Sequence, residues 1–186
     1  DLVFVYSPTF LEQLENVGLK VLYLRSLSDD FIKTADNIRL WGRIVGNPSA
    51  SEALAADFEV RVQHITETMS PYARGISVFQ DAGGLWTPSP DTLMGEVLDL
   101  LKLRNIAYDV SGYVQLSPEV IVERNPQIII ASYGDTISGN PAFKDLLAVR
   151  NDRIYVPQSD ALSVAGPRLI EGIEELAAWV YPGLFE

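Results

Sequence analysis

Residues 47–69 read NPSASEALAADFEVRVQHITETM, and this stretch is predicted to form one long helix. Asn47 suits the N-cap, Pro48 suits the first helical position, and Ser49 with Glu52 has the spacing of a capping box. Apolar residues recur at steps of three or four and predict one buried stripe, made of Leu54, Phe58, Val62, Ile65 and Met69. This local pattern fits either a crossover within one sheet or a strut between two lobes.

Both flanks of the long helix alternate predicted strands with predicted helices. The predicted strands are 2–6 and 20–24 before the helix, and 75–80, 106–109, 127–132 and 153–157 after it. Four parallel strands can form a complete small sheet, whereas two parallel strands alone are marginal. The unequal strand counts therefore favour the strut, and they predict that the first lobe has lost its opening strand–helix units.

The predicted fold class is α/β, with two parallel-sheet lobes joined by a single long helix and the first lobe incomplete. The predicted boundaries are a partial N-terminal lobe at 1–47, a connecting helix at 48–70 and a C-terminal lobe at 71–186. Serine or asparagine followed by proline predicts further helix starts, which fall at Ser7, Ser89, Ser117 and Asn140. Residues 81–89 and 110–116 are predicted to be loops.

Composition narrows the classes of function. The 186 residues are 47% apolar and 21% charged, which is ordinary for a globular protein. A net charge of −11 argues against a nucleic-acid surface, and the lack of cysteine excludes disulfides and thiolate metal sites. The chain has no initiating methionine and opens directly on DLVFVY, a predicted buried strand, so we expect it to be cut from a longer protein.

Aromatic residues gather where the predicted strands end. Ligands of open parallel sheets bind outside the carboxyl ends of the strands. The residues predicted there are Tyr6, Tyr23, the loop 83–87 with Trp86 and Thr87, Tyr113, Tyr133, Asp135 and Asp160. Several rings around one cleft would suit a large, flat or partly apolar ligand held by stacking and burial.

Other chemistry has weaker support in the sequence. Asp81, Asp135 and Asp160 at strand ends could hold a hard cation for an α/β enzyme. His64 is the only histidine, has no metal-ligand spacing around it and gives no serine an obvious base. No phosphate-binding glycine motif is present, so neither a nucleotide nor a resident cofactor or metal is predicted.

The second half of the chain resembles a known family. SPEVIVERNPQIIIAS at 117–132 and NPAFKDLLAVRNDRIYVPQSDALSVAGPRLIEGIEELAAWVYPGLF at 140–185 are similar to the substrate-binding proteins of ABC importers for metal chelates. DLVFVYS at 1–7 also fits that family, so the resemblance covers essentially the whole chain. In family members, two α/β lobes are joined by one long helix, and the proteins bind ferric siderophores, haem or vitamin B12 without catalysis.

The resemblance implies a ligand site and a partner. Tyr6, Tyr23, Trp86, Tyr113 and Asp160 match cleft positions of the vitamin B12-binding members, and GLWTPSPDTLMGEVL at 84–98 fits especially well. Those members carry an arginine where this chain has Val164, which keeps siderophore and haem as alternatives to a corrinoid. With Thr87 and Tyr133 from the strand ends, these residues complete the predicted ligand-binding set.

Glu119 has a sufficient local role, because an acidic side chain in the first turn of a helix is stabilised by the helix dipole. The resemblance adds a second role, since Glu119 matches a second-lobe glutamate that docks on the membrane permease. The expected partners are therefore an ABC-transporter permease dimer and a metal chelate. The expected location is periplasmic or on the outer face of the membrane, with contact to the membrane only through the permease or a lost lipid anchor. An interaction module that kept the fold but lost the ligand remains a third interpretation.

Overall fold

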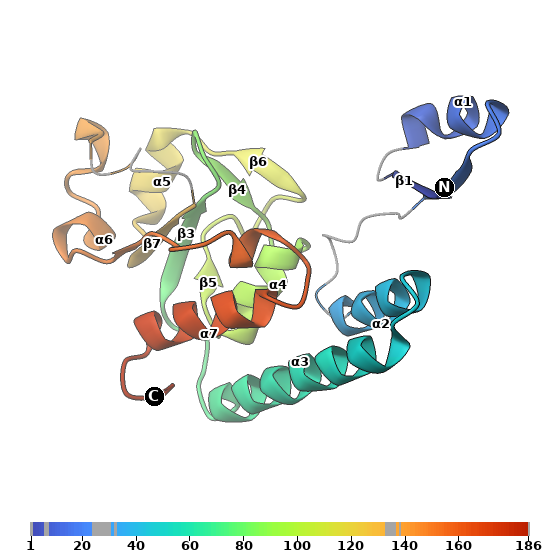
Figure 1. Ribbon diagram of the computed structural model, residues 1–186. Helices are drawn as coiled ribbons and strands as arrows, with labels where there is room; N and C mark the ends of the chain where they lie inside the picture. Colours follow the sequence, from blue (N-terminus) through green and yellow to red (C-terminus); the bar gives the residue numbers. More distant parts are fainter. Residues whose placement is uncertain are drawn as a thin grey trace.

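The computed structural model describes residues 2–5, 8–23, 31, 33–132, 137 and 139–185. Figure 1 shows two α/β parts and the long helix α3 below them. The N-terminal part comprises β1 (Leu2–Val5), a 3-10 turn (Pro8–Phe10), α1 (Leu11–Asn16), β2 (Lys20–Tyr23) and α2 (Thr34–Ile44). Helix α3 (Pro48–Met69) follows. The C-terminal part comprises β3 (Ser77–Asp81), β4 (Trp86–Pro88), α4 (Leu93–Leu100), β5 (Arg104–Asn105), β6 (Tyr113–Gln115), α5 (Pro118–Arg124), β7 (Ile128–Ala131), a 3-10 turn (Pro141–Phe143), α6 (Leu147–Arg150), β8 (Ile154–Tyr155), a 3-10 turn (Ala161–Ser163) and α7 (Leu169–Val180).

The C-terminal part is built on a four-stranded parallel sheet with the order β5-β3-β7-β8. Three of the predicted strands overlap β3, β7 and β8. The strand predicted at 106–109 is wrong in its position, because β5 ends at Asn105 and residues 106–109 form a turn. Strand β7 is buried along its whole length, and its side chains alternate between two cores. Ile128 and Ile130 join the core under α4, α7 and α3, while Ile129 joins the core under α5 and α6. The sheet is therefore covered by helices on both faces, as a parallel sheet requires.

The N-terminal part contains a two-stranded parallel sheet, in which β1 pairs with β2 from Leu2↔Lys20 to Val5↔Tyr23. Phe4 of β1 lies against Trp41 of α2, with ring centroids 4.5 Å apart. Helix α2 in turn lies alongside α3 (Figure 1). Gly42 permits this close approach, because a Cβ at that position would lie 1.7 Å from the Ser51 hydroxyl oxygen on α3.

Helix α3 contacts both parts of the molecule. Phe58 packs against Phe31 from the segment before α2, with ring centroids 5.8 Å apart. Arg61 donates to both carboxylate oxygens of Glu174 on α7, at 2.8 and 2.5 Å. The long helix is therefore a connector between the two parts, as the strut interpretation predicts, and does not cover one sheet alone.

The predicted stripe of α3 is correct at Phe58, Ile65 and Met69, which are buried, and wrong at Leu54, which is 51% exposed. Ala55 is buried in its place, because α2 approaches α3 on that side. Within the described residues, no side-chain cap is present at Asn47, and Glu52 accepts hydrogen bonds from Arg39. The predicted capping box is therefore wrong.

The other predicted helix starts agree in part. Ser117 accepts a hydrogen bond from the Val120 N–H, and Asn140 accepts one from the Ala142 N–H, as N-cap residues do. The helix expected from Ser89 and the proline after it instead begins at Leu93, with Thr92 as its cap. Within the described ranges, no helix combines the length and the apolar character that crossing a lipid bilayer requires.

Replacement of Ile65 by alanine should lower the free energy of unfolding by about 2–5 kcal/mol, because it removes a fully buried side chain from the core beside α3. Leu54→Ala on the same helix is the matched control, and its effect should stay within roughly 0.5 kcal/mol because Leu54 is half exposed. Urea unfolding followed by circular dichroism measures both values. Equal losses would contradict the observed burial pattern of α3.

Candidate functional site

A short antiparallel ribbon carries two of the predicted aromatic residues. Strands β4 and β6 pair with the register Trp86↔Gln115, Thr87↔Val114 and Pro88↔Tyr113. Because side chains alternate along a strand, Trp86, Tyr113 and Gln115 share one face of the ribbon. Most of that face is open, since Trp86 is 47% and Tyr113 is 52% exposed, although Pro88 on the same face is buried. Thr87 is fully buried on the opposite face, where Val114 packs against the core under α5.

The conformation of the loop between β3 and β4 orients Trp86. Asp81 ends β3, and its carboxylate Oδ1 accepts hydrogen bonds from the Gly83 and Leu85 N–H groups, both at 2.9 Å. The backbone turns through positive φ at Gly83, Gly84 and Leu85, a conformation that glycine adopts without strain. The Ala82 N–H then donates to the Trp86 carbonyl at 2.7 Å. The buried carboxylate therefore fixes the start of β4.

The connection from β5 to α5 is braced by Arg124. Its guanidinium donates to both carboxylate oxygens of Asp109, at 2.8 and 2.7 Å, and to the Ile106 carbonyl at 2.5 Å. It also lies over the Tyr108 ring, 5.0 Å from the centroid. The hydrogen bonds from Arg124 lower the pKa of the Asp109 carboxyl below its usual range. The segment that precedes β6 is thus tied to α5, the helix that follows it.

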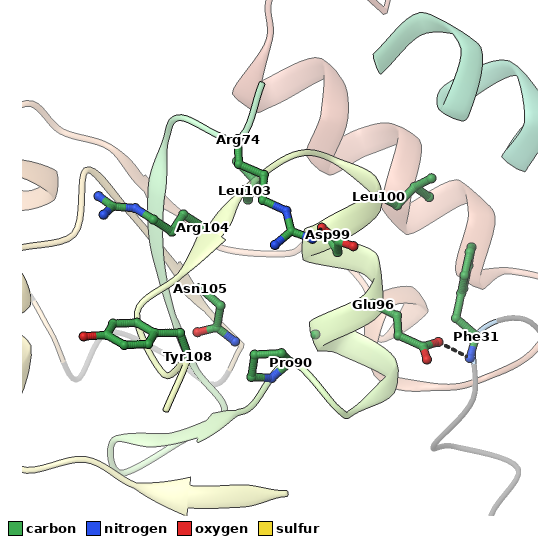
Figure 2. A pocket seen from close by; sticks show the side chains of 11 residues that line it. Phe31, Arg74, Pro90, Glu96, Asp99, Leu100, Leu103, Arg104, Asn105 and Tyr108 are labelled. Atoms are coloured by element: carbon green, nitrogen blue, oxygen red, sulfur yellow. Dashed lines mark hydrogen bonds and ion pairs between the residues drawn. The ribbon is translucent and has the colours of Figure 1, made fainter. Parts of the chain in front are cut away.

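A pocket of about 450 Å³ opens between α4 and the edge strand β5 (Figure 2). Its polar groups largely satisfy one another, because Arg74 pairs with Asp99 and Glu96 accepts the Phe31 N–H at 2.8 Å. The described residues that line it include none of the predicted ligand-binding residues. We therefore interpret it as a gap at the junction of the two parts, and we place the candidate site at the exposed face of the β4–β6 ribbon.

Comparison with known proteins gives the family. The model of the family described as periplasmic binding protein matches residues 3–161. The chain belongs to the periplasmic binding protein family.

Three relatives illustrate the similarity. An ABC transporter substrate-binding lipoprotein, YvrC of Bacillus subtilis, is 29% identical over 97% of this chain and 60% of that protein. A vitamin B12-binding protein of Vibrio cholerae is 26% identical over 93% of this chain and 64% of that protein. The crystal structure of a periplasmic haem-binding protein from Pseudomonas aeruginosa has a TM-score of 0.78 and 26% identity, over 98% of this chain and 71% of that one. The chain thus spans less than two thirds of the length of the two relatives matched by sequence.

In this periplasmic binding protein, the predicted ligand-binding residues lie in both the N-terminal and the C-terminal part. Trp86 and Tyr113 lie together on the ribbon, and Tyr23 lies at the end of β2, partly buried. Asp160 precedes the last 3-10 turn and is exposed, where it accepts a hydrogen bond from Arg168 at 2.6 Å. Tyr6 and Tyr133 lie outside the described residues.

Thr87 does not share the exposed face of Trp86 and Tyr113. Its side chain is fully buried, because it is the middle residue of a three-residue strand and alternates with the exposed Trp86. Among the strand-end carboxylates considered for catalysis, Asp81 is 1% exposed and holds the loop to Trp86, while Asp135 lies outside the described residues.

Glu119 lies exposed in the first turn of α5. Its own backbone N–H and the Ser117 hydroxyl hold the pKa of its carboxyl below the usual value, so it is ionised at neutral pH. Its position in the first turn of a helix is the one that the sequence predicts. Its role in docking stays a prediction.

The binding-protein ribbon is the feature that the sequence analysis missed. Residues 81–89 and 110–116 were expected to be loops, but each contributes a strand of three residues. Gln115 belongs to the exposed face, and its side-chain amide donates to the Gly84 carbonyl at 2.8 Å. The alternation in Trp86-Thr87-Pro88 and Tyr113-Val114-Gln115 is the available signal, but three residues are too few for a period to stand out.

Asp81→Ala should destabilise the protein by roughly 1.5–3 kcal/mol, because it leaves the Gly83 and Leu85 N–H groups without their carboxylate acceptor. Asp81→Asn is the matched control, since its amide oxygen can still accept. Chemical unfolding followed by tryptophan fluorescence gives both values. Unchanged stability in Asp81→Ala would show that the loop does not depend on this carboxylate.

Proposed function

We propose that the chain is part of the substrate-binding protein of an ABC importer, and that it captures a metal chelate and delivers it to a membrane permease. The observation that carries this proposal is the ribbon face, where Trp86 and Tyr113 are both about half exposed. The family match and the B12-binding and haem-binding relatives support a chelate as the ligand. The proposed boundaries remain 1–47, 48–70 and 71–186.

The geometry of the ribbon suits a broad, partly apolar ligand. Trp86 and Tyr113 are diagonal neighbours on paired strands, a position that puts side chains roughly 7–8 Å apart at their bases. Two rings at this spacing can cover a flat ligand larger than a single aromatic ring. Tyr23, at the end of β2, would add a contact to the ligand from the N-terminal part. The ligand would then lie between the N-terminal part and the ribbon.

The polar groups proposed to bind the ligand lie in the segment before α7. Asp160 and Arg168 form an exposed ion pair, with a guanidinium nitrogen 2.6 Å from the carboxylate. A peripheral amide of a chelate could donate to Asp160 and accept from Arg168, and a peripheral carboxylate could accept from Arg168. A corrinoid and a ferric siderophore are the proposed ligands, with haem as the alternative within the family.

An enzyme is the second candidate function, and the carboxylates argue against it. Asp81 is buried and bonded to its own loop, and Asp160 is paired with Arg168. Neither is left as a free base facing a substrate. The proposed role is therefore binding without turnover, and conversion of a bound chelate by the purified protein would favour the enzyme.

Glu119 is proposed to dock on the permease. Its carboxylate is exposed, ionised and held at the start of α5, where it could pair with a cationic side chain of a partner. This role places the protein on the outer face of the membrane, in the periplasm or on a lipid anchor. The lipoprotein named among the relatives supports that location.

Trp86→Ala should weaken chelate binding about tenfold or more, because it removes the larger ring of the stacking face. Titration of the longer native protein with cyanocobalamin, haem and a ferric hydroxamate, followed by tryptophan fluorescence or calorimetry, measures the change. Tyr72→Ala is the matched control, since Tyr72 is also 47% exposed but lies after α3, away from the ribbon. No binding of any of these chelates by the parent protein would refute the ligand proposal.

Glu119→Gln should slow uptake in vesicles that contain the cognate permease while leaving chelate affinity unchanged, because the carboxylate points away from the core into solvent. Glu123→Gln, one turn later on the same exposed helix, is the control and should transport normally. An equal loss of chelate affinity in Glu119→Gln would mean that Glu119 belongs to the ligand site instead.

A further inference from the structure

The Asp91 carboxylate accepts three hydrogen bonds, two of them from residues that are distant in the sequence. Asp91 lies in the turn between β4 and α4, and its carboxylate accepts from the Ser89 hydroxyl, from the Ser111 hydroxyl at 2.5 Å and from the Gly112 N–H at 3.0 Å. Ser111 and Gly112 are 20 and 21 residues further along the chain. The carboxylate therefore joins two segments that are distant in sequence.

Helix capping does not account for Asp91. The hydroxyl of Thr92 accepts the Gly95 N–H at 3.1 Å and donates to the Ser89 carbonyl at 2.8 Å, so Thr92 caps α4. The turn before α4 is also fixed by sterics, because a Cβ on Gly95 would lie 2.2 Å from the Ser89 carbonyl oxygen. The Asp91 side chain is left to hold the segment before β6.

The segment Ser111–Gly112 sets the orientation of Tyr113. Gly112 immediately precedes Tyr113 and has a positive φ of 72°, so its conformation sets the direction in which β6 begins. Both of its peptide groups are fixed, because its N–H donates to Asp91 and its carbonyl accepts the Ser89 N–H at 2.9 Å. The bonds of Asp91 thus lie directly beyond the last pair of the ribbon, Pro88↔Tyr113.

The ribbon depends on such a clamp because it is short. It has three residue pairs, and two-stranded ribbons are marginally stable alone. Pro88 has no N–H to donate to the pairing. One end is held by the bond from Gln115 to the Gly84 carbonyl, and the other end is held by Asp91.

The charge of Asp91 strengthens the clamp. The hydroxyls of Ser111 and Ser89 and the Gly112 N–H hold the pKa of the Asp91 carboxyl well below its usual range. The group is therefore an ionised acceptor at neutral pH, and hydrogen bonds to an ionised acceptor are shorter and stronger than neutral ones.

We propose that Asp91 is a positioning residue of the ligand site, which fixes the Ser111–Gly112 turn so that the Tyr113 ring is held beside Trp86 before the ligand arrives. The inference rests on the proposed function, because it assumes that the ribbon face binds the chelate. A face arranged in advance avoids the entropy of ordering two aromatic side chains during binding. Asp91 touches no ligand itself.

The test compares Asp91→Ala with Asp91→Asn in the longer native protein. Asp91→Ala should weaken cyanocobalamin or haem binding about fivefold to twentyfold, while the protein stays folded because Asp91 lies outside the four-stranded parallel sheet. Asp91→Asn should recover most of the affinity, because its amide oxygen can still accept the Gly112 N–H. Asp99→Ala is the matched control, since Asp99 is exposed on α4 but pairs with Arg74.

Amide exchange of Gly112 and the NMR signals of the Tyr113 ring separate this proposal from the proposed function. In Asp91→Ala, Gly112 should exchange faster and the Tyr113 signals should shift or broaden, with or without a ligand. If the parent protein binds no chelate, the proposed function fails, and these two signals still decide the role of Asp91. Unchanged exchange and unchanged ring signals in Asp91→Ala, or an affinity loss that Asp91→Asn does not recover, would overturn the positioning role.

Discussion

The attachment of α3 to its neighbours is the constraint on which the two-part arrangement depends. On one side, Arg39 of α2 donates to both carboxylate oxygens of Glu52 and of Glu59 on α3. On the other side, Arg61 donates to both oxygens of Glu174 on α7. Exposed ion pairs of this kind contribute only about 0–1 kcal/mol each, but the planar fork of arginine fixes the direction of approach. The apolar contacts of Phe58, Ile65 and Met69 supply the larger stabilisation.

The main elements could be predicted from the sequence because their signals are long or strongly apolar. The 22 residues of α3 have a proline at the start and a repeating apolar stripe, and the three isoleucines of β7 match a strand that is buried on both faces. The stripe failed at Leu54 for a tertiary reason, since the position of α2 decides which side of the first turns is covered. Periodicity identifies a helix face, but only the neighbouring helix decides how far around that face burial extends.

The candidate site was predicted less completely than the fold. The resemblance and the strand-end argument both selected Trp86 and Tyr113, which the structure brings onto paired strands. The strand-end argument alone also selected Thr87, although the alternation of a three-residue strand turns its side chain into the core. The ribbon itself was missed because residues 89–112 separate its two strands and each strand is too short to have a recognisable pattern. The braces at Asp81, Asp91 and Arg124 were missed for the same reason, since each acts through long-range or main-chain bonds that leave no motif.

The separation of the two ribbon faces has a consequence for how such a protein can change its cargo. The inner face, with Thr87 and Val114, is part of the core, whereas the outer positions 86, 113 and 115 are held mainly by main-chain pairing and by polar braces behind them. Residues at the outer positions can therefore be exchanged without creating a cavity or breaking the parallel sheet. Selection, or a protein engineer, can alter the shape and chemistry of the recognised molecule on this strip while the scaffold stays constant.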